Sequence, residues 1–96
     1  MLALVLAAAG AVGPPWEVVP EGRSVNGLEW YAVVCDGVRH ASYSCPEVAA
    51  EVAGELRRRK FGPFWYRGRD ATWAVRTGGE IFETAVGRVA DRKRRN

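Results

Sequence analysis

Residues 29–56 read EWYAVVCDGVRHASYSCPEVAAEVAGEL, and this stretch holds the two strongest structural signals of the 96-residue chain. Its first half places β-branched and aromatic residues on both sides of Asp36-Gly37, a dipeptide typical of a two-residue hairpin turn. Its second half repeats small apolar residues at helical spacing after Pro46. We therefore expect a β-hairpin that is followed directly by an α-helix.

The turn at Asp36-Gly37 determines the pairing of the expected hairpin. Because position 45 then lies near position 28, far from Cys35, we expect two free thiols and no disulfide. The expected partners across the two strands are Cys35 with Val38, Ala32 with Ala41, and Trp30 with Tyr43.

The helix expected after Pro46 has clear signals at both ends. Ser44 and Glu47 fit an S-x-x-E capping box, and Pro46 suits the first turn. The basic run 57–60 suits the carboxyl end of the helix dipole, and Phe61-Gly62-Pro63 ends the helix. One apolar stripe is expected to face the core, namely Val48, Ala49, Val52, Ala53 and Leu56. The polar side carries Glu47, Glu51 and Glu55.

The segments outside residues 29–56 complete the expected fold. Residues 16–20 predict a short first strand, and residues 64–68 and 71–77, on either side of Arg69-Asp70, predict a second hairpin. Residues 81–89 fit a helical face, although a strand over 80–85 also fits. The predicted class is α+β, with a small antiparallel sheet in the order hairpin–helix, hairpin–helix, packed against one or two helices.

The chain divides into an apolar leader (1–15), one α+β domain (16–91) and a basic tail (92–96). The leader has the length of a signal peptide but lacks the basic residue that usually precedes one, so we expect a cytoplasmic protein, with export as the alternative. Its apolar run is shorter than the roughly 20 residues that cross a bilayer, so no membrane span is expected.

Charge is sorted along the sequence. Residues 1–56 hold seven acidic and two basic side chains, a net of −5, whereas residues 57–96 hold four acidic and twelve basic side chains, a net of +8. Basic residues interspersed with Trp and Tyr suit phosphates and the faces of bases. The second half of the chain is therefore where we look for a binding surface.

The predicted second hairpin concentrates these residues. Its outward face would carry Trp65, Arg67 and Arg76, with Arg69 at the tip, and could stack a base while holding its phosphates. The alternative is an amphipathic strand whose outer face is merely solvated. The tail adds further candidate phosphate ligands, which a solvated tail would explain equally well. They are Arg92, Lys93, Arg94 and Arg95.

The chain has few residues of the types that catalyse reactions or bind metals. His40 is the sole histidine, and two cysteines with one distant histidine are too few for a structural zinc site. The chain has no Gly-rich phosphate loop, HExxH or GxSxG motif. We therefore expect no enzymatic activity, no catalytic residue, no metal site and no cofactor.

Five short segments follow one another between residues 16 and 77: Val18-Val19-Pro20, Trp30, Arg39-His-Ala-Ser42, the Ala/Glu-rich stretch 46–56 and Arg67-Gly-Arg-Asp70. In these segments the sequence resembles a family of small bacterial domains of unknown function. The resemblance implies a fold and supplies no catalytic residues. The chain departs from the family in its longer first loop (21–27), its apolar leader and its basic tail.

Three strands followed by a helix are also similar to the arm-binding domain of phage integrases and the plant ethylene-response DNA-binding domain. That likeness implies a sheet lying in the major groove. Here the first three strands carry only Arg39 beside four acids, a charge that does not suit a groove-binding sheet.

These observations predict a small non-enzymatic binding module that contacts nucleic acid through the second hairpin and the tail. The alternative is a protein-interaction or structural module, from a phage or mobile element, with no role in nucleic-acid binding. In that alternative the partner is an acidic protein surface or another copy of the chain, whose acidic half would meet the basic half of its neighbour.

Overall fold

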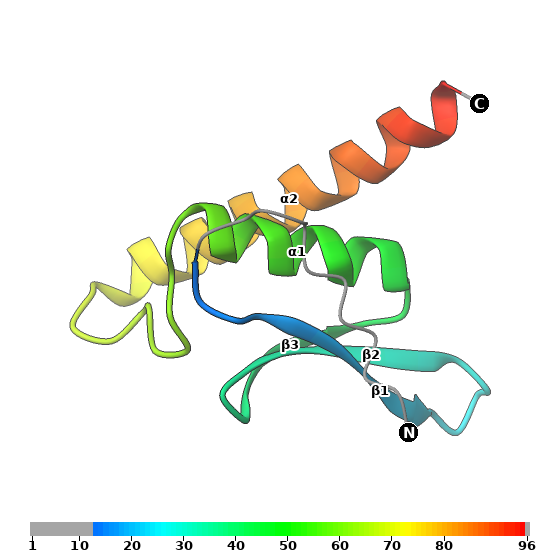
Figure 1. Ribbon diagram of the computed structural model, residues 1–96, viewed down its shortest axis with the longest axis horizontal. Helices are drawn as coiled ribbons and strands as arrows, with labels where there is room; N and C mark the ends of the chain where they lie inside the picture. Colours follow the sequence, from blue (N-terminus) through cyan, green and yellow to red (C-terminus); the bar gives the residue numbers. More distant parts are fainter. Residues whose placement is uncertain (1–12, 96) are drawn as a thin grey trace.

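The computed structural model describes residues 13–95 and has an α+β fold, as the sequence predicts. Three antiparallel strands form one sheet in the order β1-β2-β3. Helix α1 lies over one face of this sheet and contacts all three strands, and α2 packs against α1 and continues past its end (Figure 1). The elements are β1 (Glu17–Arg23), β2 (Glu29–Cys35), β3 (Val38–Tyr43), α1 (Pro46–Arg58) and α2 (Ala71–Arg94).

The first hairpin forms around Asp36-Gly37, where both residues adopt positive φ angles of 50° and 79°. Cys35 lies opposite Val38, as expected, but the register shifts by one residue between Val33 and Val34. An extra residue on β3, His40, separates the partners of Val34 and Val33 and forms a bulge. The expected pairs Ala32–Ala41 and Trp30–Tyr43 are therefore wrong. The observed pairs are Ala32 with Ser42 and Tyr31 with Tyr43.

Helix α1 buries the apolar stripe expected from its spacing. The expected capping box is wrong, because the N-cap is Cys45, and no side-chain cap hydrogen bond forms there among the described residues. Ser44 lies one position too early to cap, and Glu47 is the second helical residue instead of the third. Pro46 occupies the first turn, where its missing N–H costs little.

The expected second hairpin is also wrong, because residues 71–94 form one helix of 24 residues. Asp70, expected to be a turn residue, is the N-cap: its carboxylate accepts hydrogen bonds from the backbone N–H groups of Thr72 (2.7 Å) and Trp73 (3.4 Å). The residues before it form consecutive turns. The helical face expected over residues 81–89 is confirmed, the alternative of a strand over 80–85 is wrong, and the basic segment is helical as far as Arg94.

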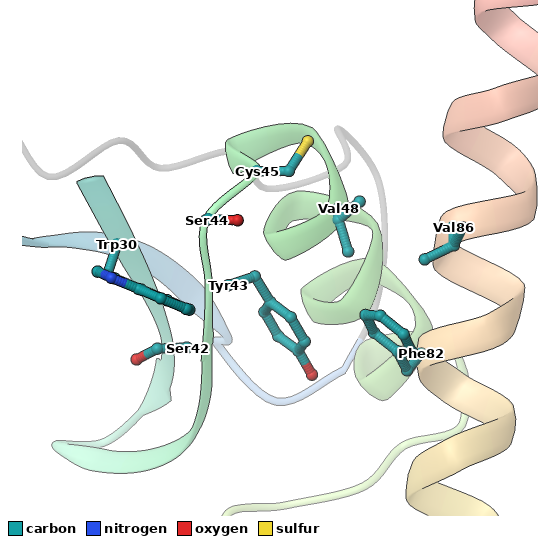
Figure 2. Close-up of a pocket in the computed structure, with 8 residues that line it drawn as sticks. All are labelled: Trp30, Ser42, Tyr43, Ser44, Cys45, Val48, Phe82 and Val86. Atoms are coloured by element: carbon teal, nitrogen blue, oxygen red, sulfur yellow. The ribbon is translucent and has the colours of Figure 1, made fainter. Parts of the chain in front are cut away.

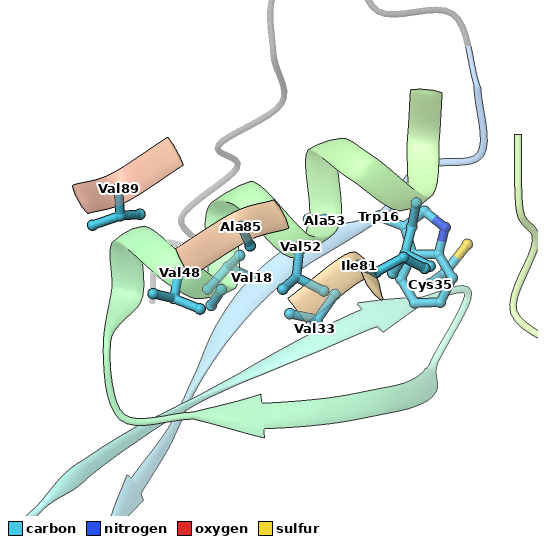
Figure 3. Packing of buried hydrophobic residues seen from close by; sticks show 12 residues of the cluster. Trp16, Val18, Val33, Cys35, Val48, Val52, Ala53, Ile81, Ala85 and Val89 are labelled. Atoms are coloured by element: carbon cyan, nitrogen blue, oxygen red, sulfur yellow. The ribbon is translucent and has the colours of Figure 1, made fainter. Parts of the chain in front are cut away.

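The core lies between the sheet, α1 and α2 (Figure 3). Trp16, which precedes β1, is 1% exposed and donates from Nε1 to the carbonyl of Phe61 at 2.7 Å, so it fastens the start of the domain to the end of α1. Both cysteines are free thiols, as expected. The buried face of α2 consists of Thr77, Ile81, Ala85 and Val89.

Within residues 13–95, neither helix combines the length and the apolar character that crossing a bilayer requires. The expected leader falls largely on residues 1–12, which lie outside the described part of the chain.

Candidate nucleic-acid interface

Acidic residues from the first half of the sequence form ion pairs with basic residues from the second half. Glutamates on one side of α1 face basic residues on the last turns of α2, and the two helices pack side by side. The result is a ladder of ion pairs that joins the acidic half of the chain to its basic half. Its contacts between the helices are Glu55–Arg88 (2.8 Å), Glu51–Arg92 (2.6 Å), Glu51–Arg88 (3.7 Å) and Glu47–Lys93 (3.9 Å).

Glu55 is the centre of this ladder. The residue is only 8% exposed, and its carboxylate also accepts hydrogen bonds from Arg58 and Arg59 on its own helix. Burial by itself would raise the pKa of Glu55, but the hydrogen bonds from Arg59, Arg88 and Arg58 outweigh it and hold the pKa below its usual value. Three guanidinium groups are thus committed to one carboxylate.

Most of the basic tail is engaged in the same way. Arg92 and Lys93 belong to the ladder, and Arg94 binds Asp91 one turn earlier at 2.6 Å. Arg95 is exposed and forms no ion pair within residues 13–95. The structure therefore assigns internal carboxylate partners to three of the four tail residues expected to bind phosphate.

Trp65 does not point outward from a strand, because the strand is absent. Its ring is half-buried, stacks on Phe61 with the ring centroids 5.1 Å apart, and meets Trp73 at 5.9 Å and His40 at 6.0 Å. Its indole Nε1 is buried and has no hydrogen-bond partner among the described residues. Trp65 thus belongs to an aromatic cluster that holds the loop 59–70 against the start of α2.

Arg67 and Arg69 lie on the exposed surface of this loop. The guanidinium carbon of Arg67 is 3.8 Å from the ring centroid of Phe64, and that of Arg69 is 4.6 Å from the ring centroid of Trp73. Both are cation–π contacts that leave the N–H groups at the edge of the guanidinium available. Neither residue forms an ion pair with a described carboxylate.

Arg76 lies nearby on the exposed side of α2 and likewise has no ion pair within residues 13–95. Val75 lines both the pocket that includes Arg76 and the pocket that includes Tyr66, so the two pockets adjoin at Val75. We call the set Phe64, Tyr66, Arg67, Arg69 and Arg76 the basic loop surface. Phe64 and Tyr66 are 42% and 46% exposed.

A pocket of about 350 Å³ adjoins this surface and includes Arg39, His40, Trp65 and Tyr66 in its lining. Burial lowers the pKa of His40, so its imidazole is neutral at pH 7. Arg39 is bound to Glu21 at 2.7 Å and to the hydroxyl of Ser42. The pocket therefore presents aromatic surface and one guanidinium that is already neutralised.

A second, apolar groove lies between the β3–α1 junction and α2, with a volume of about 230 Å³ (Figure 2). Tyr43 stacks on Phe82 across it, with ring centroids 5.6 Å apart and planes 10° from parallel. Trp30 and Val48 line one wall and Val86 the other. The sequence did not signal this groove, because the position of Tyr43 depends on the bulge at His40 and the opposite wall depends on how α2 packs on α1.

Comparison of the chain with protein-family models, with curated proteins and with solved structures gave no match. The resemblance to small bacterial domains therefore stays a prediction. Within residues 13–95, no three His, Cys, Asp or Glu side chains cluster as metal ligands would.

Proposed function

We propose that this protein is a non-enzymatic module that binds single-stranded nucleic acid at the basic loop surface. The observation that supports the proposal most is the contrast between two groups of cations. The ladder cations are neutralised by glutamates of α1, whereas Arg67, Arg69 and Arg76 form no ion pair within the described part of the chain. An arginine that is not already paired with a carboxylate can bind a phosphate and release its counterion without first losing an ion pair.

Exposed rings beside these cations favour single strands over duplexes. Phe64 and Tyr66 offer faces on which unpaired bases can stack, and base–aromatic stacking contributes roughly 1–3 kcal/mol per base. Bases in a duplex are already stacked on each other and cannot use these rings. The sheet carries Glu17, Glu21 and Glu29 and is a poor partner for a phosphate backbone.

The test is a titration of labelled oligothymidine and oligouridine, and of a duplex of equal length, followed by fluorescence anisotropy at several salt concentrations. We expect micromolar binding of the single strands at low salt. If three phosphates are neutralised, the logarithm of the affinity should fall with the logarithm of salt with a slope of about −2. Absence of binding at low salt, or binding that ignores salt, contradicts the proposal.

Single substitutions locate the site. Arg67→Gln, Arg69→Gln and Arg76→Gln should each weaken binding and make the salt dependence shallower by about one phosphate. Arg23→Gln is the matched control, because it removes the same charge at an exposed arginine that is paired with Glu29 at 3.1 Å. Equal losses in all four variants would show that net charge, and not the basic loop surface, drives the binding.

A further inference from the structure

Helix α2 has a second, uncovered face. Its buried side packs on α1, but Val75, Phe82 and Val86 are 77%, 43% and 40% exposed. Ala90, which follows Val86 at the same helical spacing, is exposed as well. Figure 1 shows α1 and the sheet on one side of α2. A helix that is apolar on two sides is expected to have a second packing partner.

Four exposed residues form a narrow seam along this face, which we call the α2 seam. They follow one another at intervals of four, three and four residues, the spacing that keeps side chains on one side of a helix. Phe82 and Val86 both lie along one edge of the seam, and a Cβ built on Gly87 would meet nothing within 4 Å. The seam consists of Glu83, Gly87, Ala90 and Arg94.

The side chains of the α2 seam are complementary to those of the same seam in a second copy that runs in the opposite direction. In two antiparallel helices related by a twofold axis, facing residues have a constant sum of residue numbers. With the axis between residues 88 and 89, Glu83 faces Arg94 of the second copy and Gly87 faces Ala90, because both pairs sum to 177. Opposite charges then meet at both ends, and the two smallest side chains meet at the centre, where helix axes can approach closely.

The charges available fit this arrangement. Glu83 forms no ion pair within residues 13–95, and Arg94 contacts only Asp91, in an exposed pair. A parallel copy would place Glu83 against Glu83 and Arg94 against Arg94, so the charges select the antiparallel orientation. We propose that the chain forms a twofold dimer in which the α2 seams of two copies pack antiparallel, with Phe82 and Val86 covering one edge of the contact.

The test is sedimentation analysis of the whole chain over a wide concentration range. The wild type should shift from the monomer mass of 10.5 kDa to twice that mass as concentration rises. Gly87→Gln should raise the dimer dissociation constant at least tenfold, because a long side chain at the centre separates the helices. Gly79→Gln is the matched control: this glycine is on the same helix and also faces open space, but its counterpart by the same sum would lie past the end of α2 at Arg94.

Exchange of charges tests the orientation. Glu83→Arg and Arg94→Glu should each weaken the dimer, and the double variant should restore it, because each new pair is again opposite in sign. A wild type that stays monomeric at every concentration overturns the proposal and leaves the face to a different protein. Equal effects of Gly87→Gln and Gly79→Gln, or a double variant no tighter than the single ones, also overturn it. Circular dichroism of every variant confirms that α2 is intact.

Discussion

Arg88 donates from Nη1 to Oε1 of Glu55 at 2.8 Å and so joins the last third of the chain to the last turn of α1. The two residues come from halves of the sequence with opposite net charge. Their contact accounts for the sorting of charge along the sequence, because acidic residues of α1 pair with basic residues of α2 where the two helices pack together. It also separates the basic residues into those that hold α2 in place and those on the basic loop surface.

Loss of the charge on Glu55 should destabilise the fold. Glu55→Gln keeps the shape of the side chain but leaves Arg58, Arg59 and Arg88 clustered without a carboxylate. Because Glu55 is 8% exposed while its partners are partly solvated, we expect a loss of about 1–3 kcal/mol. Unfolding in urea measures it.

The control for this substitution is Glu29→Gln. Glu29 pairs with Arg23 at 3.1 Å, but both side chains are more than half exposed. Such pairs contribute little, so the change should stay within about 0.5 kcal/mol. Equal losses at both positions would mean that the ladder contributes no more than any surface pair.

The pKa of Glu55 predicts how this stabilisation depends on pH. The folded pKa lies below the ordinary value of 4.5, so the unfolded chain binds the proton more readily. The contribution is therefore fully present above about pH 4.5 and is lost as the pH falls through the folded pKa. The pKa values of Glu21 and Glu29 are also lowered, so the wild type alone cannot isolate Glu55.

The comparison that isolates Glu55 is the difference in unfolding free energy between the wild type and Glu55→Gln as a function of pH. This difference should be constant near neutral pH and shrink below about pH 4.5. A difference that does not change with pH would contradict the assigned pKa.

The start of α2 should depend on the side chain of Asp70. Asp70→Ala removes the acceptor for the backbone N–H groups of Thr72 and Trp73 and should cost about 1 kcal/mol. Asp91→Ala makes the same change near the other end of α2, where an acid is unfavourable to the helix dipole, and should cost less than about 0.5 kcal/mol. Thermal unfolding of both variants measures the two losses of stability, and equal losses would contradict a stabilising cap at Asp70.

Comparison of Asp70 with the first hairpin shows which parts of the fold could be predicted from the sequence and which could not. Asp36-Gly37 determined a turn through its own conformational preference, and the α1 stripe had enough turns to show its period. Residues 64–77, by contrast, contain aromatic and β-branched residues that favour a strand locally. The cap at Asp70 and the packing of Ile81 and Ala85 on α1 override that preference, and the packing is not visible in a local pattern.

The candidate site was predictable only in part, for the same reason. Arg67, Arg69 and Arg76 are exposed because they are charged, whichever secondary structure holds them. The commitment of Arg92 and Lys93 to α1 could not be foreseen, since it depends on two helices lying side by side. The position of Trp65 depends on the path of a loop, which sequence patterns describe least well.

The rings of Trp16 and Trp65 each lie 6.0 Å from the ring of His40, centroid to centroid. Replacing each tryptophan with phenylalanine should have a different effect on stability. Trp16→Phe removes the donor to the carbonyl of Phe61 and opens a cavity at a side chain that is 1% exposed, so we expect a loss of about 2–4 kcal/mol. Trp65→Phe removes an Nε1 that has no hydrogen-bond partner among the described residues, from a half-buried ring. Its cost should stay below about 1.5 kcal/mol. Urea unfolding of the two variants measures both, and a larger loss for Trp65→Phe would mean that the indole of Trp65 has a partner in solution.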